Sequence, residues 1–303
     1  MKKDYKNFNT TSCMLCGEKG LSFVNNLRDD DEHWAARCNT CGHVQTTPLP
    51  TIDEDEKLYQ DNMFRRLISK SEMDDILLMQ KYEPYADKQV NIIKNRLPKD
   101  KTILEIGSGY GWFIEKIRAE GYVAEGIELS DEKCEMALKR ANIQLHNINI
   151  LRDGSQDIGK FDAVCMFQVL EHIAEPVEFL KRASQFLKKN GCVVIEVPNF
   201  NAYMKQYSKE YNDFSYFRCH LSYFTPETLT KVLDMAGFTN IRILGDQLYS
   251  VENAIHWIRN KEPFKPYCQV EMPDGLEFVN KFYQQQMEEN LTSDCLVAIG
   301  EIL

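Results

Sequence analysis

Residues 101–113 of this chain, KTILEIGSGYGWF, join a short apolar run to a turn that has glycine at every second position and opens a helical pattern. The glycines are Gly107, Gly109 and Gly111. Glycine allows a sharp turn and a close approach of the backbone to a ligand, because it has no Cβ. The next apolar segment ends at Glu128, about twenty residues after the turn, where a carboxylate can accept hydrogen bonds from ribose hydroxyls. The stretch predicts a nucleotide-type ligand at the carboxyl end of a strand.

The spacing of this turn differs from that of a dinucleotide-binding fingerprint. Its glycines follow a G-x-G-x-G pattern, and Trp112 stands where the fingerprint needs its third glycine. The strand before the turn ends in an acidic residue, Glu105. A nicotinamide dehydrogenase is therefore a distant alternative.

Outward from the turn, apolar runs alternate with helical patterns, which is typical of βαβ units and predicts an α/β fold with a parallel, doubly wound sheet. Ser130 is a plausible N-cap for one of the helices. The last apolar run suits a closing antiparallel strand. The expected strands are residues 102–108, 122–130, 143–150, 161–170, 192–199, 239–246 and 294–303. The expected helices are residues 111–121, 131–142, 175–191 and 225–238, with a mostly helical insertion at 247–290.

The turn, Glu128 and the later blocks FDAVCMFQVLEHIAEP and LKKNGCVVIEVPN resemble the class I methyltransferases that use S-adenosylmethionine (SAM). The resemblance covers residues 101–245 and the final strand, and it implies a Rossmann-like sheet, mostly parallel with an antiparallel last strand. It also implies that the glycine turn contacts the methionine part of SAM, and that Asn149 and Ile150 lie near the adenine. The cofactor-binding residues implied in this way are Glu105, Gly107, Ser108, Gly109, Gly111, Glu128, Leu129, Asn149, Ile150, Phe167 and Gln168.

Two CxxC pairs near the N-terminus predict a structural zinc site. Each pair is followed by a glycine, Gly17 or Gly42, which permits the tight turn of a zinc knuckle. Four thiolates in tetrahedral geometry suit Zn²⁺ and close its coordination sphere. His33 and His43 are alternative ligands that more naturally face solvent or pack locally. The predicted ligands of this small zinc ribbon, residues 1–50, are Cys13, Cys16, Cys38 and Cys41.

The charge of the chain argues against nucleic acid as a partner. The formal net charge is −10, and residues 1–50 carry six Lys or Arg against six Asp or Glu, including the acidic run at residues 29–32. A ribbon that reads RNA is expected to be visibly basic. A scaffold role for the ribbon beside the active site is therefore favoured. An RNA methyltransferase guided by the ribbon is an alternative, and an inactive binding protein of the same fold is another.

One histidine stands in a distinctive segment, HLSYFT, which begins at His220. With the ribbon and the SAM motif, this segment resembles the sugar methyltransferases that act on nucleotide-linked deoxysugars, in which this histidine serves in proton transfer. Phe217 and Cys219 stand where those enzymes have tyrosine and glutamate, and their long C-terminal domain has no counterpart here. These departures favour O-methylation of a sugar or glycan-related small molecule over C-methylation. His220 is the predicted general base, and His172 is a second catalytic candidate.

Further residues are expected to contact the substrate. Residues 51–100 read as a helical linker or lid before the SAM-binding domain at 101–303, and tyrosines such as Tyr82 and Tyr85 are candidates to line the pocket. Arg218 is a candidate for a substrate phosphate, with a surface salt bridge as the alternative. The predicted substrate-binding residues are Tyr59, Arg65, Asn199 and Arg218.

The remaining composition predicts a cytoplasmic protein with a small-molecule substrate. No run approaches 18 apolar residues, and no apolar core follows the basic N-terminal residues, so neither a membrane span nor a secretory signal is expected. Several scattered cysteines stand inside apolar strands, where free cysteine behaves as a small hydrophobe, which favours a reducing compartment.

Overall fold

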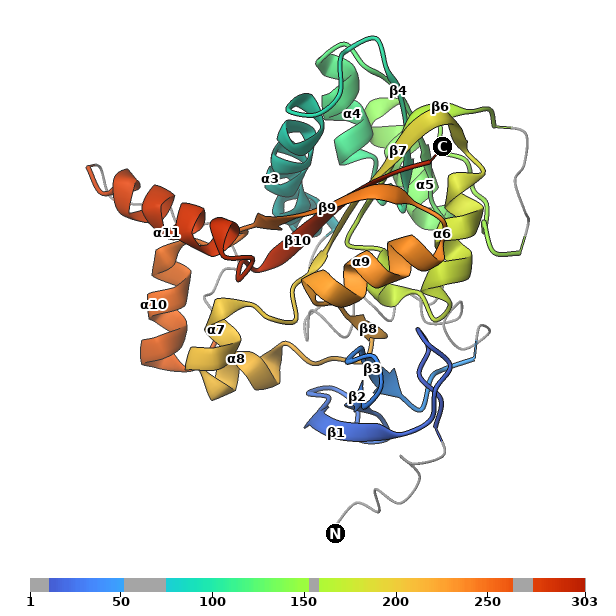
Figure 1. The fold of residues 1–303 in the computed structure, drawn as a ribbon. Helices are drawn as coiled ribbons and strands as arrows, with labels where there is room; N and C mark the ends of the chain where they lie inside the picture. The colour runs from blue at the N-terminus through green and yellow to red at the C-terminus, as the bar shows by residue number, and fades with distance from the viewer. Residues whose placement is uncertain (1–10, 52–74, 153–157, 264–274, 303) are drawn as a thin grey trace.

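The computed structural model describes residues 11–51, 75–152, 158–263 and 275–302, with the side chains of α3 described from residue 85. A large sheet covered by helices on both faces forms the centre of the molecule, and a small sheet near the N-terminus lies at one end of it (Figure 1).

The large sheet has six strands in the order β5-β4-β6-β7-β10-β9. The first four pair in parallel, and β10 runs antiparallel to both of its neighbours. The predicted Rossmann-like sheet with an antiparallel last strand is confirmed, and the last strand lies between β7 and β9. The strands are β4 (Thr102–Ile106), β5 (Val123–Ile127), β6 (Phe161–Phe167), β7 (Leu187–Pro198), β9 (Thr239–Asp246) and β10 (Cys295–Glu301).

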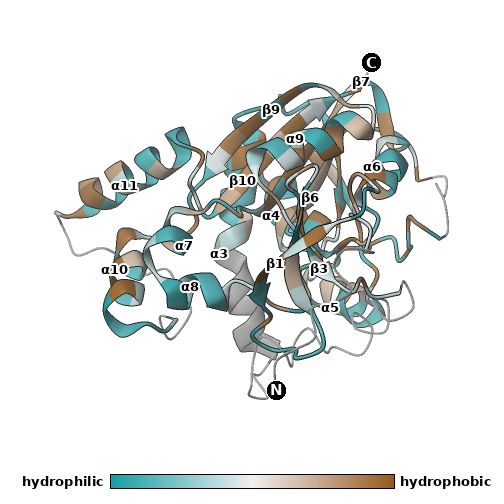
Figure 2. Cartoon of the chain, turned by 60° about the horizontal axis from the view of Figure 1, so that its bottom comes forward, coloured by the Kyte–Doolittle hydropathy of each residue, from teal (hydrophilic) through white to brown (hydrophobic). Residues whose placement is uncertain are grey.

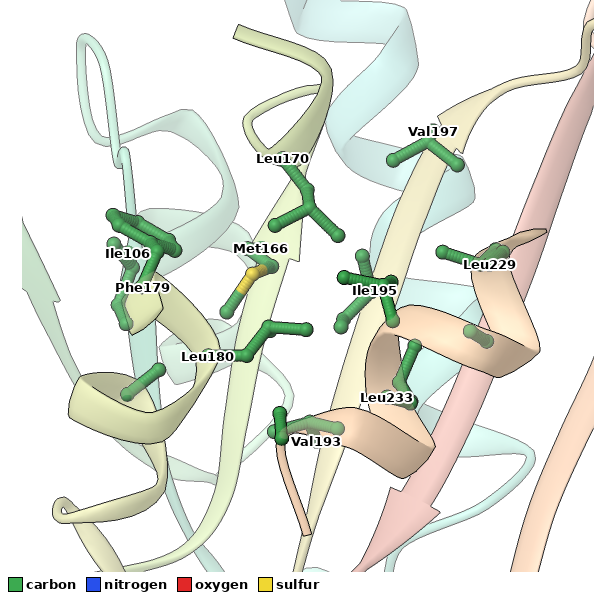
Figure 3. Close-up of a cluster of buried hydrophobic side chains, with 14 of the residues drawn as sticks. Ile106, Met166, Leu170, Phe179, Leu180, Val193, Ile195, Val197, Leu229 and Leu233 are labelled. Carbon is green, nitrogen blue, oxygen red and sulfur yellow. The ribbon is translucent and has the colours of Figure 1, made fainter. Parts of the chain in front are cut away.

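Alternate residues of the strands supply two apolar cores, because successive side chains of a strand point to opposite faces. In β7, Val193, Ile195 and Val197 face the helices α6 (Pro176–Ser184) and α9 (Pro226–Met235), as Figure 3 shows. Val194 belongs to the core on the other face, which is covered by α3 (Asp75–Lys94), α4 (Trp112–Ala119) and α5 (Asp131–Ala141). Strand β10 is largely apolar (Figure 2), as a strand buried on both faces requires.

Helix α5 begins where the sequence predicts, with Ser130 Oγ accepting from the backbone N–H of Lys133. Two other predictions of local structure are wrong. The expected strand at 143–150 makes only one bridge, between His146 and Ile127. Its continuation turns away at Asn149, whose side-chain oxygen accepts from the backbone N–H of Leu151, and such local bonds compete with strand pairing. The helix expected at 175–191 ends at Ser184, because the chain from Leu187 onward already belongs to β7.

The small sheet has four antiparallel strands, in the order β1-β2-β3-β8. Strands β1 (Leu21–Asn26), β2 (Trp34–Cys38) and β3 (Val44–Thr47) come from the predicted ribbon. The fourth strand, β8 (Ser222–Tyr223), comes from a much later part of the chain and begins two residues after His220. A bridge between Phe224 and Asn199 then ties β8 to the carboxyl end of β7. The ribbon is thereby joined to the large sheet beside the ends of its strands.

Short helical segments surround this junction, and two longer helices lie beyond β9 and β10 (Figure 1). The predicted helical insertion at 247–290 contains one helix before and one helix after the residues that the structure does not describe. None of the described helices is long and apolar enough to cross a membrane. The segments are η1 (Leu170–His172), α7 (Tyr203–Tyr207), α8 (Lys209–Phe214), α10 (Val251–Asn260) and α11 (Glu277–Glu289).

Candidate active site

The glycine turn between β4 and α4 needs its glycines. Gly107, Gly109 and Gly111 have φ angles of 80°, 55° and 76°, in the left-handed region that favours glycine. A Cβ on Gly107 would lie 2.5 Å from Cγ2 of Val169, the residue that precedes η1. The turn therefore packs directly against the segment that leads to His172.

Glu128 organises the turn from the end of β5. Its side chain is buried, and one carboxylate oxygen accepts from the backbone N–H of Gly109 at 2.8 Å while the other accepts from that of Ser130 at 2.9 Å. A carboxylate oxygen can accept more than one hydrogen bond. Glu128 therefore holds the turn and keeps acceptor capacity for ligand hydroxyls.

Glu105 lies beneath the turn at the end of β4. It is 4% exposed, and its Oε2 has no hydrogen-bond partner among the described residues. Burial raises the pKa of Glu105 to about 8; the charge of Glu128 adds to this, and the Ser108 hydroxyl opposes it. A buried carboxyl group with a spare acceptor fits a ligand that brings a cation, and the methionine part of SAM carries an ammonium group. The residues of this turn therefore fit the cofactor.

We expect the free energy of unfolding of the Glu105→Gln variant to depend less on pH than that of the parent protein. The carboxyl group ionises near its ordinary pKa of 4.5 when unfolded but near 8 when folded, so its contribution to stability is lost as the pH rises from about 5 through 8. Glutamine removes that loss. The difference in the free energy of unfolding between the two proteins should therefore change by on the order of 3 kcal/mol from pH 5 to pH 8. Urea unfolding of the ligand-free proteins measures it, with Glu135→Gln, which changes an exposed carboxylate of α5, as control. Parallel pH profiles for all three proteins would contradict the prediction.

Other predicted cofactor residues lie around the same strand ends but differ in exposure. Ile150 and Phe167 are buried, and the Phe167 ring packs on Phe113 with a centroid distance of 5.1 Å. Gln168 follows β6 with a φ of 56°, and its Nε2 donates to Glu196 Oε1 at 2.7 Å. The backbone oxygen of Leu129 accepts from Asn147 Nδ2 at 3.3 Å.

A second cluster, the Glu171–His172–His220 cluster, lies next to the turn. One ligand atom from each of its three side chains lies within 4.8 Å of the other two. His172 Nδ1 is 2.6 Å from the backbone oxygen of Cys219, which can only accept, so Nδ1 donates and Nε2 carries the lone pair of the neutral ring. The rings of His172 and His220 are 5.0 Å apart. The structure therefore brings together the two histidines that the sequence selects.

Burial keeps both imidazoles neutral. It lowers the pKa of His172 to about 4, with the Cys219 carbonyl opposing the shift. It also lowers the pKa of His220 well below its usual range, helped by the charges of Lys205 and Arg28 and by the repulsion that a protonated His172 would exert. A neutral imidazole has a lone pair for a proton, a hydroxyl hydrogen or a metal ion, but a low pKa makes it a weak base.

The ribbon holds the backbone of His220. Thr46 of β3 donates its hydroxyl to the carbonyl of His220 at 2.6 Å and its backbone N–H to the carbonyl of Leu221 at 2.9 Å. His43 is fully buried beside these strands and packs on the ring of Phe224 at 5.5 Å, so it belongs to the core. His33 pairs with Asp30 at 2.8 Å.

The four N-terminal cysteine thiols are gathered in the geometry of a metal site. Their sulfur atoms lie within 4.8 Å of one another, with two pairs at 3.6 Å, and all four are free of disulfides. Four thiolates at about 2.3 Å from a tetrahedral zinc ion would be separated by roughly 3.8 Å. The cluster of Cys13, Cys16, Cys38 and Cys41 is therefore compatible with a zinc ribbon.

The predicted substrate residues have structural partners where the structure describes them. Asn199 is buried, donates to the carbonyls of Leu291 and Ser293 at 2.9 Å each, and accepts from the backbone N–H of Asn201. Arg218 forms an ion pair with Asp30 at 3.4 Å, the alternative left open by the sequence.

The remaining substrate candidates come from the linker. Tyr59, Arg65 and the side chain of Tyr82 lie outside the described residues. Tyr85 is half-buried and hydrogen-bonds to Tyr249.

Two contributors to the site were missed by the sequence reasoning. Glu171 stands beside His172 in the chain, and a charged residue at the end of an apolar strand was the available signal. Thr46 gave no signal, because its contact with His220 depends on the pairing of β3 with β8.

Comparison with known proteins agrees with this geometry. The sequence model of a methyltransferase domain family matches residues 79–243. The chain belongs to this family. A SAM-dependent methyltransferase from Archaeoglobus fulgidus is similar in structure, with a TM-score of 0.51, 16% identity, and coverage of 75% of this chain and 100% of that one. Magnesium protoporphyrin IX methyltransferase from Synechocystis, solved with bound S-adenosylhomocysteine, has a TM-score of 0.50, 11% identity, and coverage of 83% and 99%. Both likenesses show the methyltransferase fold.

Sequence relatives of this methyltransferase-family chain include enzymes of ubiquinone biosynthesis. An O-methyltransferase from Coxiella burnetii is 25% identical over 126 residues, which are 40% of this chain and 51% of that protein. The mitochondrial enzyme from Arabidopsis thaliana is 27% identical over 177 residues, which are 51% of this chain and 54% of that protein. The chain thus spans about half the length of these relatives. Family and fold support SAM as the cofactor.

Proposed function

We propose that this protein transfers the methyl group of SAM to a hydroxyl oxygen of a small molecule. The observation that carries the proposal is the glycine turn held by Glu128 and underlain by Glu105, with the neutral imidazoles of His172 and His220 next to it. When bound, SAM supplies a methyl group that its sulfonium already activates. The protein then has to hold the cofactor, orient the acceptor and allow a proton to leave.

On the cofactor side, the backbone of the turn approaches the methionine part, and Glu105 faces its ammonium group. Glu128 accepts hydrogen bonds from ribose hydroxyls. The other predicted cofactor residues complete this part of the proposal: Ser108, Leu129, Asn149, Ile150, Phe167 and Gln168.

On the acceptor side, His172 and His220 present lone pairs beside the turn. A general base must be neutral before it takes a proton, and burial provides that state. Because the basicity of His220 is low, it would take the proton late, as the oxygen becomes acidic during bond formation. The rings of Phe217 and Tyr223, at 4.0 and 6.0 Å from that of His220, would border the acceptor.

The acceptor class is the finer part of the proposal. A nucleotide-linked sugar or glycan precursor rests on the resemblance of the segment that begins at His220. The comparisons described above give no argument for a sugar substrate, and the two sequence relatives described there are named for ubiquinone biosynthesis. A panel of sugar and phenolic hydroxyl acceptors, with transfer measured from labelled SAM, tests the two classes against each other.

The ribbon would serve as a scaffold. In this proposal, residues 1–50 bind one structural Zn²⁺ through four cysteines, residues 51–100 form a linker or lid, and residues 101–303 bind SAM. The support is the arrangement of the four thiols and the hold of Thr46 on the His220 segment.

Glu128→Ala tests cofactor binding. The variant loses the acceptor for ribose hydroxyls and the bond to Gly109, and hydrogen bonds to charged groups contribute about 1.5–3 kcal/mol each, so we expect the affinity for SAM to fall roughly 30-fold. Calorimetry with zinc-loaded protein measures this. Glu125→Ala, which changes a more exposed carboxylate of the same strand, is the matched control and should bind SAM normally. A parent protein that binds no SAM would overturn the proposed function.

A further inference from the structure

Glu171 is a buried carboxyl group close to the predicted catalytic histidines. Its side chain is 1% exposed, and neither carboxylate oxygen has a hydrogen-bond partner among the described residues. Burying a carboxylate without donors costs several kcal/mol, so buried carboxylates are normally paired or bind a metal. The nearest cationic or metal-binding groups to Glu171 therefore matter.

Two imidazoles face this carboxylate. His172 Nε2 lies 3.8 Å from Glu171 Oε1, which is less than twice a metal–ligand distance of about 2.1 Å, so one ion can contact both atoms. The bond from His172 Nδ1 to the Cys219 carbonyl leaves the Nε2 lone pair on the side of the carboxylate. Metal-binding histidines typically donate their other ring N–H in this way. His220 brings a third ligand atom within 4.8 Å of the other two.

The backbone holds these residues in place. The backbone N–H of Leu221 donates to the carbonyl of Glu171 at 2.8 Å, which joins the two segments that carry the ligands. Thr46 fixes the carbonyl of His220 from the ribbon side. The three ligands are thus anchored by η1, by the segment before β8 and by β3.

We propose that Glu171, His172 and His220 bind one divalent first-row transition-metal cation. Two imidazoles and one carboxylate suit Mn²⁺, Fe²⁺ or Zn²⁺ better than the all-oxygen sites preferred by Ca²⁺ or Mg²⁺. Three protein ligands leave positions open for a further ligand, as in catalytic metal sites.

The chemical role of the cation rests on the proposed function. Val169, two residues before Glu171, touches the glycine turn, so the cation lies beside the cofactor site. The acceptor hydroxyl binds the cation and loses its proton to water, because a bound cation lowers the pKa of a coordinated oxygen. The oxygen lone pair then forms the bond to the methyl carbon, while the electron pair of the carbon–sulfur bond stays on sulfur and S-adenosylhomocysteine leaves. In this arrangement His220 is a metal ligand, and the cation replaces it as the group that activates the acceptor.

Titration with Mn²⁺ tests the site, because thiolates bind Mn²⁺ weakly and the zinc-loaded cysteine cluster is therefore silent. We expect full-length protein loaded with one equivalent of Zn²⁺, which the four thiolates take up first, to bind one Mn²⁺ per chain, seen as loss of the electron paramagnetic resonance signal of free Mn²⁺. Glu171→Gln and His220→Ala should each weaken binding at least about 10-fold. His146→Ala is the matched control, because it removes an imidazole that pairs with a different carboxylate, Glu125, at 2.7 Å, and it should bind Mn²⁺ like the parent.

Folding and cofactor binding are checked on the same preparations. Glu171→Gln removes a buried ionisable group without a donor, so it should fold at least as stably as the parent. Mn²⁺ should raise the melting temperature of the parent and of His146→Ala, but not that of the two ligand variants. A parent that binds no Mn²⁺, or whose Mn²⁺ binding is unchanged in both ligand variants, overturns the cation site. SAM binding by calorimetry separates the two proposals. If the protein binds SAM but not Mn²⁺, the proposed function stands with His220 as the base. If it binds Mn²⁺ but not SAM, the cation site stands and the proposed function is overturned.

Discussion

Serine in place of Cys38 is expected to lower methyl transfer at least about 100-fold, the effect of a misplaced reacting group, while the affinity for SAM changes by no more than about threefold. Cys38 is the last residue of β2 and one of the four clustered thiols, and three thiols no longer close a tetrahedral site. Strand β2 pairs with β3, and β3 pairs with β8, the strand that follows His220. Loss of zinc should therefore release the Thr46 contact with His220.

The cofactor turn should survive this change, because its partners lie elsewhere. Gly107 and Ser108 donate their backbone N–H groups to the carbonyl of Ile127, and Gly109 donates to Glu128. None of these contacts involves the small sheet. SAM affinity is thus a measure of folding that is independent of turnover.

The experiment compares zinc content, SAM affinity and turnover in three variants. Cys192→Ser changes a half-buried cysteine of β7 outside the cluster and should match the parent in all three. Thr46→Val keeps the four thiols but removes the hydroxyl bond to His220, so it should retain zinc and lose part of the turnover. Normal turnover by a zinc-free Cys38→Ser protein would show that the ribbon does not position the site.

Alanine in place of Gly107 is expected to weaken SAM binding by about 100-fold or more, because clashes and strain at this position displace the cofactor turn. Its φ of 80° is unfavourable for any residue with a Cβ, and the added methyl would lie 2.5 Å from Val169 Cγ2. Since Val169 is held between β6 and η1, the turn itself must move.

Gly121→Ala separates the two causes. Gly121 has a φ of 93°, but no atom lies within 4 Å of an added Cβ, so this variant carries the backbone strain without the clash. It should lose about 1–2 kcal/mol of stability and bind SAM normally. In the double variant Gly107→Ala/Val169→Ala the clashing methyl is gone, and part of the SAM affinity should return. Calorimetry and urea unfolding measure both quantities, and a Gly107→Ala protein that binds SAM like the parent would refute the assignment.

The glycine turn and its contact with Glu128 could be predicted because they depend on short-range structure. The left-handed conformations of the turn require glycine, and Glu128 ends the next strand, which pairs in parallel with β4 and so brings the carboxylate to the same sheet edge. The expected strand at 143–150 failed for a local reason, the competing side-chain bond of Asn149. The periodicity of the apolar residues could not reveal that competition.

The proposed acceptor half of the site depends on contacts between distant segments. Glu171 and His172 follow β6, His220 precedes β8, and the bond between Leu221 and Glu171 brings them together. From the sequence, His220 had a family resemblance in its favour, whereas Glu171 had only its position beside His172. Its burial without a donor is visible only in three dimensions.

By itself, the sequence determined the α/β class, the glycine turn with Glu105 and Glu128, and the two CxxC motifs, because each follows from residue types at fixed short spacings. The tertiary structure alone decided that the ribbon takes its fourth strand from residues 222–223, and that this strand places His220 against Glu171 and His172. The physical reason is that within the described residues of the ribbon alone β3 pairs only with β2, so its other edge could pair with any strand of suitable geometry. Only the packing of the whole chain brings β8 to it.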